Sequence, residues 1–403
     1  MASAAAVQPD LPFALVEEIL LRLDDAADLI RASAACASFR RLISDGCFLC
    51  RFRSLHRLPI LGILTGTCQC YGGISFYPAR PPNISVPAAR ALARAADFSF
   101  TSLPGPTHYW RIRDVRDGRV LLSKRGASAI VNLFVSESLV VYDPLHRHHV
   151  QIPPIPHDLL AAMGHADKWH EFDPFLIPAA AGGKDDLSFQ VMCNVLFEHK
   201  VEAVLYSSVT EEWRGVASSS ITSYKCIQFP CLVERSYARG CFYWVDYIET
   251  VMLVLDMREM KFSLIDLPAG SKHRHKAIVE VMEDRIGLLI VGENMLDLYS
   301  KTLPGIGAKD WRHDHTIRLS DDYEWSLTGG AVEGYGFLFG TPRYELEVWE
   351  NSQEDKKEEP PSAHCFTVEF ETLQVQELCV LKFDAHPHFL YASLPPPFAT
   401  PSL

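Results

Sequence analysis

A short pattern that returns along most of the chain constrains its fold more than any other feature of the sequence. A run of Val, Leu, Ile or Tyr ends in a tyrosine or aspartate, a turn follows, and a second apolar run or a tryptophan comes next. The copies start at Leu139, Val204, Val254 and Leu296, at intervals of roughly 45 to 65 residues. Repeats of this kind are typical of β-propellers, whose radially arranged blades protect their sheet edges. The repeat therefore predicts a β-propeller.

Candidate strands support this prediction, because they are rich in β-branched and aromatic residues and are bounded by turn residues. They lie at residues 120–123, 139–142, 189–195, 203–207, 251–255, 262–265, 286–291 and 366–370. Residues 58–79 are expected to form a further pair of strands, and 87–96 and 158–165 to be helical. A pair of β-sandwiches is the structural alternative, but so many strands in one stretch favour a propeller of about six or seven blades.

The first 57 residues have a different texture, with apolar residues at helical spacing. Leu15, Ile19 and Leu23 recur every four residues, which predicts a short amphipathic helix, and a second helical pattern follows at 36–43. Pro12 stands where the first helix can begin, because a first-turn proline gives up only an N–H group that has no partner there. Helices this short bury little apolar surface, so the segment is expected to leave an apolar face for a partner.

The order of proline, acidic, cysteine and aromatic residues in this segment resembles the F-box. The F-box is the helical module through which F-box proteins dock on the Skp adaptor of cullin–RING ubiquitin ligases, and the resemblance implies a helix-in-groove contact. The adaptor-binding residues that it implies are Leu11, Pro12, Leu15, Glu18, Ile19, Leu20, Leu23, Leu29, Cys36 and Phe39. Glu18 also precedes Arg22 by four residues, which predicts an ion pair along the helix.

The segment departs from the F-box pattern at two positions. Ala37 stands where the family often has a lysine or arginine, and Phe39 stands where it usually has a tryptophan. On periodicity alone, the leucines have an alternative role, which is to pack a small helical subdomain against the rest of the chain.

The resemblance continues into the strand-rich part. Residues 239–244, RGCFYW, resemble the G-x-x-Y-W strand of the kelch-like β-propeller that accompanies F-boxes in large plant families. The resemblance thus implies a plant F-box protein of multidomain α plus all-β class. Its expected parts are a disordered N-terminus at 1–8, an F-box at 9–56, a β-propeller at 57–395 and an extended or disordered tail at 396–403.

The function implied by this resemblance is that of a substrate receptor in an SCF-type ubiquitin ligase. The F-box would hold the chain to the Skp adaptor and its cullin, and the propeller would present an unidentified target protein, which contributes proximity and no bond chemistry. Aromatic residues in polar loops are candidate target anchors, with blade packing as their alternative role. They are Trp169, Tyr247, Tyr323 and Trp325. A scaffold without a role in degradation and a propeller enzyme are the alternative functions.

Charge argues against a nucleic-acid partner. The net charge is −12, residues 9–57 carry equal numbers of acidic and basic side chains, and the acidic remainder has no basic run. Residues 58–79 lack charge but contain prolines, glycines and polar groups, so no membrane span is expected. The N-terminus lacks the features of a signal peptide, and the cysteines have no regular spacing, so the expected location is the cytoplasm, the nucleus or both.

The sequence predicts no metal site, no cofactor and no enzymatic activity. Cys47 and Cys50 form a C-x-x-C with His56 nearby, but no second cysteine pair follows at zinc-finger spacing. Histidines two residues apart, such as His313 and His315, could share one strand face, yet nothing joins the pairs. The sequence contains neither a G-x-S-x-G elbow nor a phosphate-binding G-x-x-x-x-G-K-[ST] loop.

Overall fold

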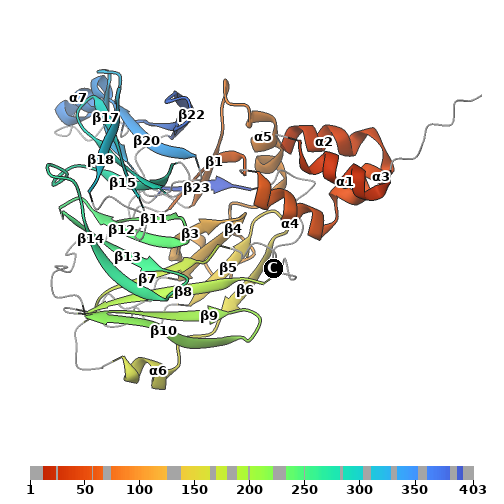
Figure 1. The fold of residues 1–403 in the computed structure, drawn as a ribbon, viewed down its shortest axis with the longest axis horizontal. Coiled ribbons are helices and arrows are strands. Elements are labelled where there is room, and N and C mark those ends of the chain that lie inside the picture. Colours follow the sequence, from red (N-terminus) through yellow and green to blue (C-terminus); the bar gives the residue numbers. More distant parts are fainter. Residues whose placement is uncertain are drawn as a thin grey trace, which may run out of the picture.

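The computed structural model of this 403-residue chain consists of a strand-rich body and a group of helices at one end of it (Figure 1). The structure describes residues 12–23, 26–56, 58–66, 74–124, 138–163, 169–178, 188–197, 200–220, 233–248, 250–281, 285–302, 310–327, 334–352, 361–381 and 388–393. The expectations for residues 1–8, for Leu11 and for the tail at 396–403 concern parts of the chain outside these ranges.

The helices among the described residues are short. The N-terminal group, here called the helical module (residues 12–56), comprises α1 (Phe13–Leu21), α2 (Ala26–Ala35), α3 (Ala37–Ile43) and α4 (Gly46–Leu55). The strand-rich body adds α5 (Val86–Ala95), the 3-10 helix η1 (Thr107–Tyr109), α6 (His157–Ala162) and α7 (Arg343–Ser352). α5 and α6 confirm the two helices expected there. α7 was not expected, because its tyrosine, valine and tryptophan are residues typical of strands.

The described strands form six antiparallel sheets, which are the blades of a β-propeller. Blade 1 contains β1 (Ile60–Thr65), β2 (Ser75–Pro78) and β23 (His388–Ala392), and blade 2 contains β3 (Trp110–Arg116), β4 (Arg119–Lys124), β5 (Leu139–Asp143) and β6 (His148–Ile152). Blade 3 contains β7 (Trp169–Leu176), β8 (Gln190–Phe197), β9 (Lys200–Ser207) and β10 (Glu212–Ser220), and blade 4 contains β11 (Val233–Ala238), β12 (Cys241–Asp246), β13 (Val251–Asp256) and β14 (Lys261–Asp266). Blade 5 contains β15 (Lys276–Glu280), β16 (Arg285–Val291), β17 (Met295–Thr302) and β18 (Arg312–Arg318), and blade 6 contains β19 (Tyr323–Leu327), β20 (Tyr335–Pro342), β21 (Ala363–Glu369) and β22 (Val375–Leu381).

The propeller predicted from the repeat is confirmed, with six blades. The four copies of the repeat coincide with β5, β9, β13 and β17, so each copy is the third strand of a blade followed by the turn into the fourth. The strands expected at 58–79 are β1 and β2, which pair with each other. Apolar side chains between adjacent blades form the core; between blades 2 and 3, for example, Leu121 and Val141 pack with Val191 and Val195.

The C-terminal strand closes the ring. β23 pairs with β1, and Leu390 lies opposite Ile63. Tyr391 of the same strand is fully buried, and its hydroxyl group donates a hydrogen bond to the carbonyl oxygen of Gly118 in blade 2, at 2.9 Å. Blade 1 therefore joins the two ends of the propeller and ties them to the next blade, which closes the ring.

Gly62 of β1 gives a first testable prediction. A Cβ atom at this position would overlap the carbonyl oxygen of Tyr77 in β2 and lie 2.9 Å from the ring of Phe76. We expect Gly62→Ala to lower the free energy of unfolding by about 1–3 kcal/mol, as overpacking does in other cores. Urea denaturation followed by tryptophan fluorescence measures the change. Ile63→Val is the control at the neighbouring buried position, with an expected cost of about 0.5–1.5 kcal/mol, and a Gly62→Ala cost below that of the control would contradict the prediction.

The propeller has two faces, because successive connections within an antiparallel blade alternate between them. The near face carries the turns at 117–118, 239–240 and 257–260, and the helical module reaches it through Pro59, whose carbonyl oxygen accepts a hydrogen bond from the amide of Ser393. The far face carries the connections at 247–250, 267–275, 292–294 and 319–322, together with α6 and α7. Figure 1 shows the helical module at the right end of the molecule and α6 and α7 at its left.

The helical module has its own small core. Buried leucine, isoleucine and phenylalanine side chains from all four helices form it: Leu20, Leu21, Leu29, Leu42, Ile43, Phe48, Leu49 and Phe52. Asp45 caps α4 by accepting hydrogen bonds from the amides of Cys47 and Phe48. His56, just after α4, stacks on Phe52 and bonds through Nε2 to the carbonyl oxygen of Leu21 at 2.6 Å, which fixes the end of α1.

Candidate functional site

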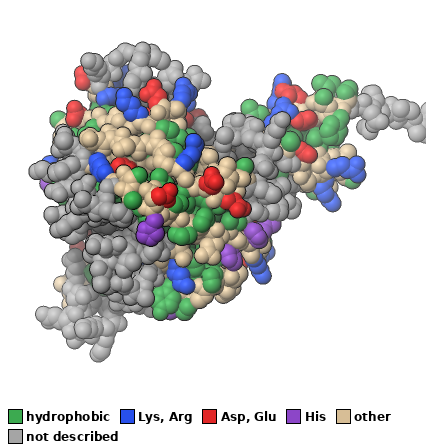
Figure 2. Space-filling view, turned by 90° about the horizontal axis from the view of Figure 1, so that it is seen from below, with side chains coloured by type: hydrophobic (Ala, Val, Ile, Leu, Met, Phe, Trp, Pro, Cys, Tyr) green, Lys and Arg blue, Asp and Glu red, His purple; other side chains and the backbone are tan. Residues whose placement is uncertain are grey.

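The outer side of α1 carries apolar side chains that the module does not bury. Leu15 and Ile19 lie one helical turn apart and are 51% and 55% exposed. On the opposite side of the same helix, Leu20 and Leu21 fill the core. Hydrophobic side chains are visible on the module's surface among charged ones (Figure 2). We call Leu15 and Ile19 the α1 strip.

Charged side chains border the α1 strip. Glu18 and Arg22 form the predicted ion pair, at 3.4 Å, and both are largely exposed. Arg51 of α4 pairs with Glu17 and lies 3.9 Å from a carboxylate oxygen of Glu18. Such exposed pairs add little stability, so the outward orientation of the strip follows from the packing of Leu20 and Leu21 in the core.

The structure divides the expected adaptor-binding residues into two groups. Pro12, Leu15, Glu18 and Ile19 are at the surface, and Phe13 joins them although the sequence did not single it out. Its position directly after the helix-starting proline was the available signal. Leu20 and Leu29 are buried in the core, and Leu23 and Phe39 pack partly against it. These four side chains therefore stabilise the fold of the module.

Cys36, also expected at the contact, is the N-cap of α3. Its sulfur accepts a hydrogen bond from the amide of Phe39 and lies 3.1 Å from the hydroxyl oxygen of Ser38. These two hydrogen bonds, the one with Ser38 first, hold the pKa of the thiol below its ordinary value. The cysteine therefore organises the start of a helix that packs beneath the surface.

The four expected target anchors all belong to the far face of the propeller. Trp169 starts β7 after the connection that holds α6, and its side chain is outside the described part. Tyr247 contacts His273 and His275 with its half-buried ring. In blade 6, Tyr323 is half-buried, and Trp325 is buried with its indole N–H donated to the carbonyl oxygen of Ser320. Trp325 thus packs within its blade, whereas Tyr247 and Tyr323 keep partly accessible rings.

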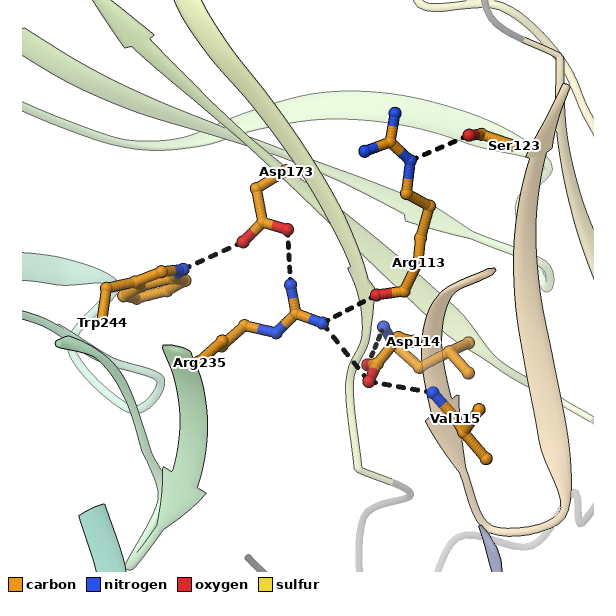
Figure 3. A network of polar contacts seen from close by, with 8 residues as sticks. Arg113, Asp114, Val115, Ser123, Asp173, Arg235 and Trp244 are labelled. Carbon is orange, nitrogen blue, oxygen red and sulfur yellow. Dashed lines mark hydrogen bonds and ion pairs between the residues drawn. The ribbon is translucent and has the colours of Figure 1, made fainter. Parts of the chain in front are cut away.

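A buried polar network links three blades where their first strands meet (Figure 3). Arg235 of β11 donates hydrogen bonds to Asp173 of β7, at 2.5 Å, and to the carbonyl oxygen of Arg113 in β3, at 3.1 Å. It also lies 3.3 Å from a carboxylate oxygen of Asp114 in β3. The indole N–H of Trp244 donates to the second oxygen of Asp173 at 2.9 Å. The network therefore connects blades 2, 3 and 4 through hydrogen bonds and ion pairs.

The electrostatics of this network favour a permanently charged Arg235. Burial by itself would lower the pKa of the guanidinium group, but the carboxylates of Asp173 and Asp114 outweigh burial and raise it. Asp114 is satisfied further by the amides of Leu176 and Val115. No pattern in the sequence indicates this cluster, because its members stand about sixty residues apart in strands of different blades.

The described residues hold no group of three or more His, Cys, Asp or Glu side chains arranged to bind a metal ion. Of the histidines considered earlier, His313 faces Asp297 and Thr316, and His56 is engaged with Leu21. Among the same residues, none of the helices is both long and apolar enough to cross a membrane.

The propeller's sequence identifies its class. Residues 111–325, more than half of the chain, match the family model described as F-box protein AT5G49610-like, beta-propeller. The chain belongs to this family of F-box-protein-type β-propellers. The match begins in β3 and ends in β19, so it does not include the helical module, for which the F-box remains a prediction.

Solved structures resemble the chain only at low identity and low TM-score. A protein from Lactobacillus plantarum has a TM-score of 0.40 at 10% identity, with 82% of this chain and 99% of that chain covered. A chain of a nidogen/laminin complex has a TM-score of 0.37 at 11% identity, with 82% and 96% covered. The Aleuria aurantia lectin has a TM-score of 0.37 at 8% identity, with 67% and 75% covered. No curated protein sequence matches the chain.

Proposed function

We propose that this protein is the substrate receptor of an SCF-type cullin–RING ubiquitin ligase. In this proposal the helical module is an F-box that docks on the Skp adaptor through the α1 strip, and the propeller binds the target protein. The protein itself makes and breaks no bonds. Its contribution is to hold the target near the ubiquitin-loaded enzyme and so to raise the effective concentration of the reacting groups.

The observation that carries the proposal is the α1 strip on a propeller of this family. Leu15 and Ile19 are half-exposed on a helix whose other side contributes Leu20 and Leu21 to the module's core. An apolar side chain that gains burial on binding contributes to affinity in proportion to the area removed from water. The strip also lies at the opposite end of the molecule from α6 and α7, so the adaptor and a target on the far face could bind together (Figure 1).

Binding of a purified Skp adaptor to the full chain, measured by isothermal titration calorimetry, tests the proposal. Burying the exposed halves of Leu15 and Ile19 contributes about 1 kcal/mol each, so the double variant Leu15→Ala/Ile19→Ala should bind about 30-fold more weakly. Val209→Ala, an exposed apolar residue on the turn between β9 and β10, is the matched control and should bind as the unchanged chain does.

Two outcomes would count against the proposal. If no Skp adaptor binds, or if the double variant binds as tightly as the control, the α1 strip is not an adaptor site. If the adaptor binds through the strip but a reconstituted ligase does not ubiquitinate proteins captured by the propeller, the ligase role fails and the scaffold role is favoured. Circular dichroism of the double variant should match that of the control, because both substituted side chains lie outside the core.

A further inference from the structure

A second apolar surface lies on the far face, on α7. This helix connects β20 to β21, and its residues Tyr344 and Val348 are one turn apart and 67% and 50% exposed. They are the counterpart of the α1 strip on the other end of the molecule. Singly exposed apolar residues need no explanation, but two such large side chains on one face of a surface helix form a candidate contact.

The start of α7 is held rigidly, so this surface is preorganised. The hydroxyl group of Tyr344 donates to Glu345 at 2.7 Å, and Glu345 also accepts hydrogen bonds from the amide and the hydroxyl of Ser362, at 2.6 and 2.8 Å. The amide of Arg343 donates to the carbonyl oxygen of Asp322 in the neighbouring connection, at 2.9 Å. Binding of a partner therefore costs little conformational entropy in α7.

Acidic side chains, here called the acidic surround, lie on α7 and on the neighbouring segment at 319–324, which the start of α7 contacts. The described carboxylates on α7, on the connection at 319–322 and on β19 outnumber the nearby guanidinium groups. The carboxylates are Asp321, Asp322, Glu324, Glu345 and Glu347, and the guanidinium groups are Arg318 and Arg343. Arg318 is already paired with Asp321. Hydrogen bonds from Tyr344 and Ser362 outweigh burial and keep the pKa of Glu345 below its ordinary value, so it stays ionised at neutral pH.

We propose that Tyr344 and Val348, with their acidic surround, bind a basic segment of the target protein that carries Lys or Arg together with an apolar anchor residue. Charge complementarity selects this occupant: the acidic surround attracts a cationic chain and repels an acidic one, and the two exposed side chains bury its anchor. The inference rests on the proposed function, in which the propeller holds the target. It adds the face that binds and the chemistry of what is bound.

A random 12-residue peptide library displayed on phage tests the proposal, with the full chain carrying Leu15→Glu/Ile19→Glu as bait. These two substitutions make the α1 strip charged, so that apolar peptides do not bind there. Enriched peptides should carry net positive charge and at least one large apolar residue. A synthetic copy of the leading peptide should bind at least tenfold more weakly to Tyr344→Ser/Val348→Ser and to Asp322→Lys/Glu347→Lys, as measured by fluorescence anisotropy. Its affinity should also fall several-fold between 50 and 300 mM salt.

The matched control lies on the near face, where Val209 is 70% exposed beside the exposed Glu211 and Glu212. Val209→Ser and Glu212→Lys should leave peptide affinity unchanged. Absence of enrichment, enrichment of neutral or acidic peptides, or equal binding to the α7 variants and the control would each overturn the proposal. Adaptor binding, measured separately, should be the same for Tyr344→Ser/Val348→Ser as for the unchanged chain. If the adaptor binds neither the unchanged chain nor Tyr344→Ser/Val348→Ser, the proposed function is wrong. The peptide-binding result on α7 would still hold.

Discussion

Replacing Arg235 by methionine should lower the free energy of unfolding by about 3–5 kcal/mol. The variant keeps most of the apolar volume but leaves Asp114 and Asp173 buried without their shared cation. Removing one partner of a buried charge network costs far more than the network contributes in total, because the remaining charges cannot regain water. Urea unfolding followed by tryptophan fluorescence measures the loss, with Trp244 as a reporter inside the network.

Two comparison variants separate charge from packing in this experiment. Arg318→Met removes an exposed pair with Asp321 and should cost less than about 1 kcal/mol. Neutralising both carboxylates as well, in Arg235→Met/Asp114→Asn/Asp173→Asn, should recover much of the loss, since amide oxygens can still accept the surrounding hydrogen bonds. If Arg235→Met and Arg318→Met have equal free energies of unfolding, the network does not stabilise the contact between the blades.

Removing β23 should abolish cooperative unfolding of the propeller. A chain that ends at residue 387 loses Leu390 and Tyr391 from the core and every hydrogen bond between β23 and β1. Each buried side chain contributes about 1.5–3 kcal/mol, and with the strand pairing the loss approaches the whole stability of a typical protein, about 5–15 kcal/mol. Differential scanning calorimetry of the shortened chain should show no sharp transition.

A chain that ends at Ser393 is the control for this truncation, because it keeps all strands of blade 1. Adding a synthetic peptide of residues 386–393 to the shortened chain should restore the transition, whereas a scrambled peptide should not. A sharp transition in the shortened chain alone would mean that the ring is held by contacts between blades and does not depend on the closing strand.

The architecture of the propeller was predictable because its signals are local. Strand residues and turn residues stand next to one another in each repeat, so β5, β9, β13 and β17 could be found from composition and spacing. α5 was found for the same reason, as a run of alanine, leucine and arginine. α7 was missed, since Tyr344, Val348 and Trp349 favour strands, although they stand among glutamates and a leucine that favour helices.

The sites were predictable only in part, because exposure depends on tertiary structure. Helical spacing places Leu15 and Leu20 equally on an amphipathic helix, and only the packing of the other helices shows that Leu20 is buried and Leu15 is not. Trp325 illustrates the same limit, as an aromatic residue in a polar stretch that turns out to pack inside a blade. The network of Arg235 with Asp114 and Asp173 joins distant strands and leaves no pattern in the sequence.

The closing strand also sets the order in which the protein can fold as it leaves the ribosome. The helical module and blades 2 to 6 are made of segments that are each continuous in sequence, so they can form while synthesis proceeds. β1 must wait for β23, more than three hundred residues later, with one edge unpaired throughout. An unpaired edge is a site for aggregation, and a contact so distant in sequence forms slowly. The nascent chain is therefore most in need of a chaperone at blade 1.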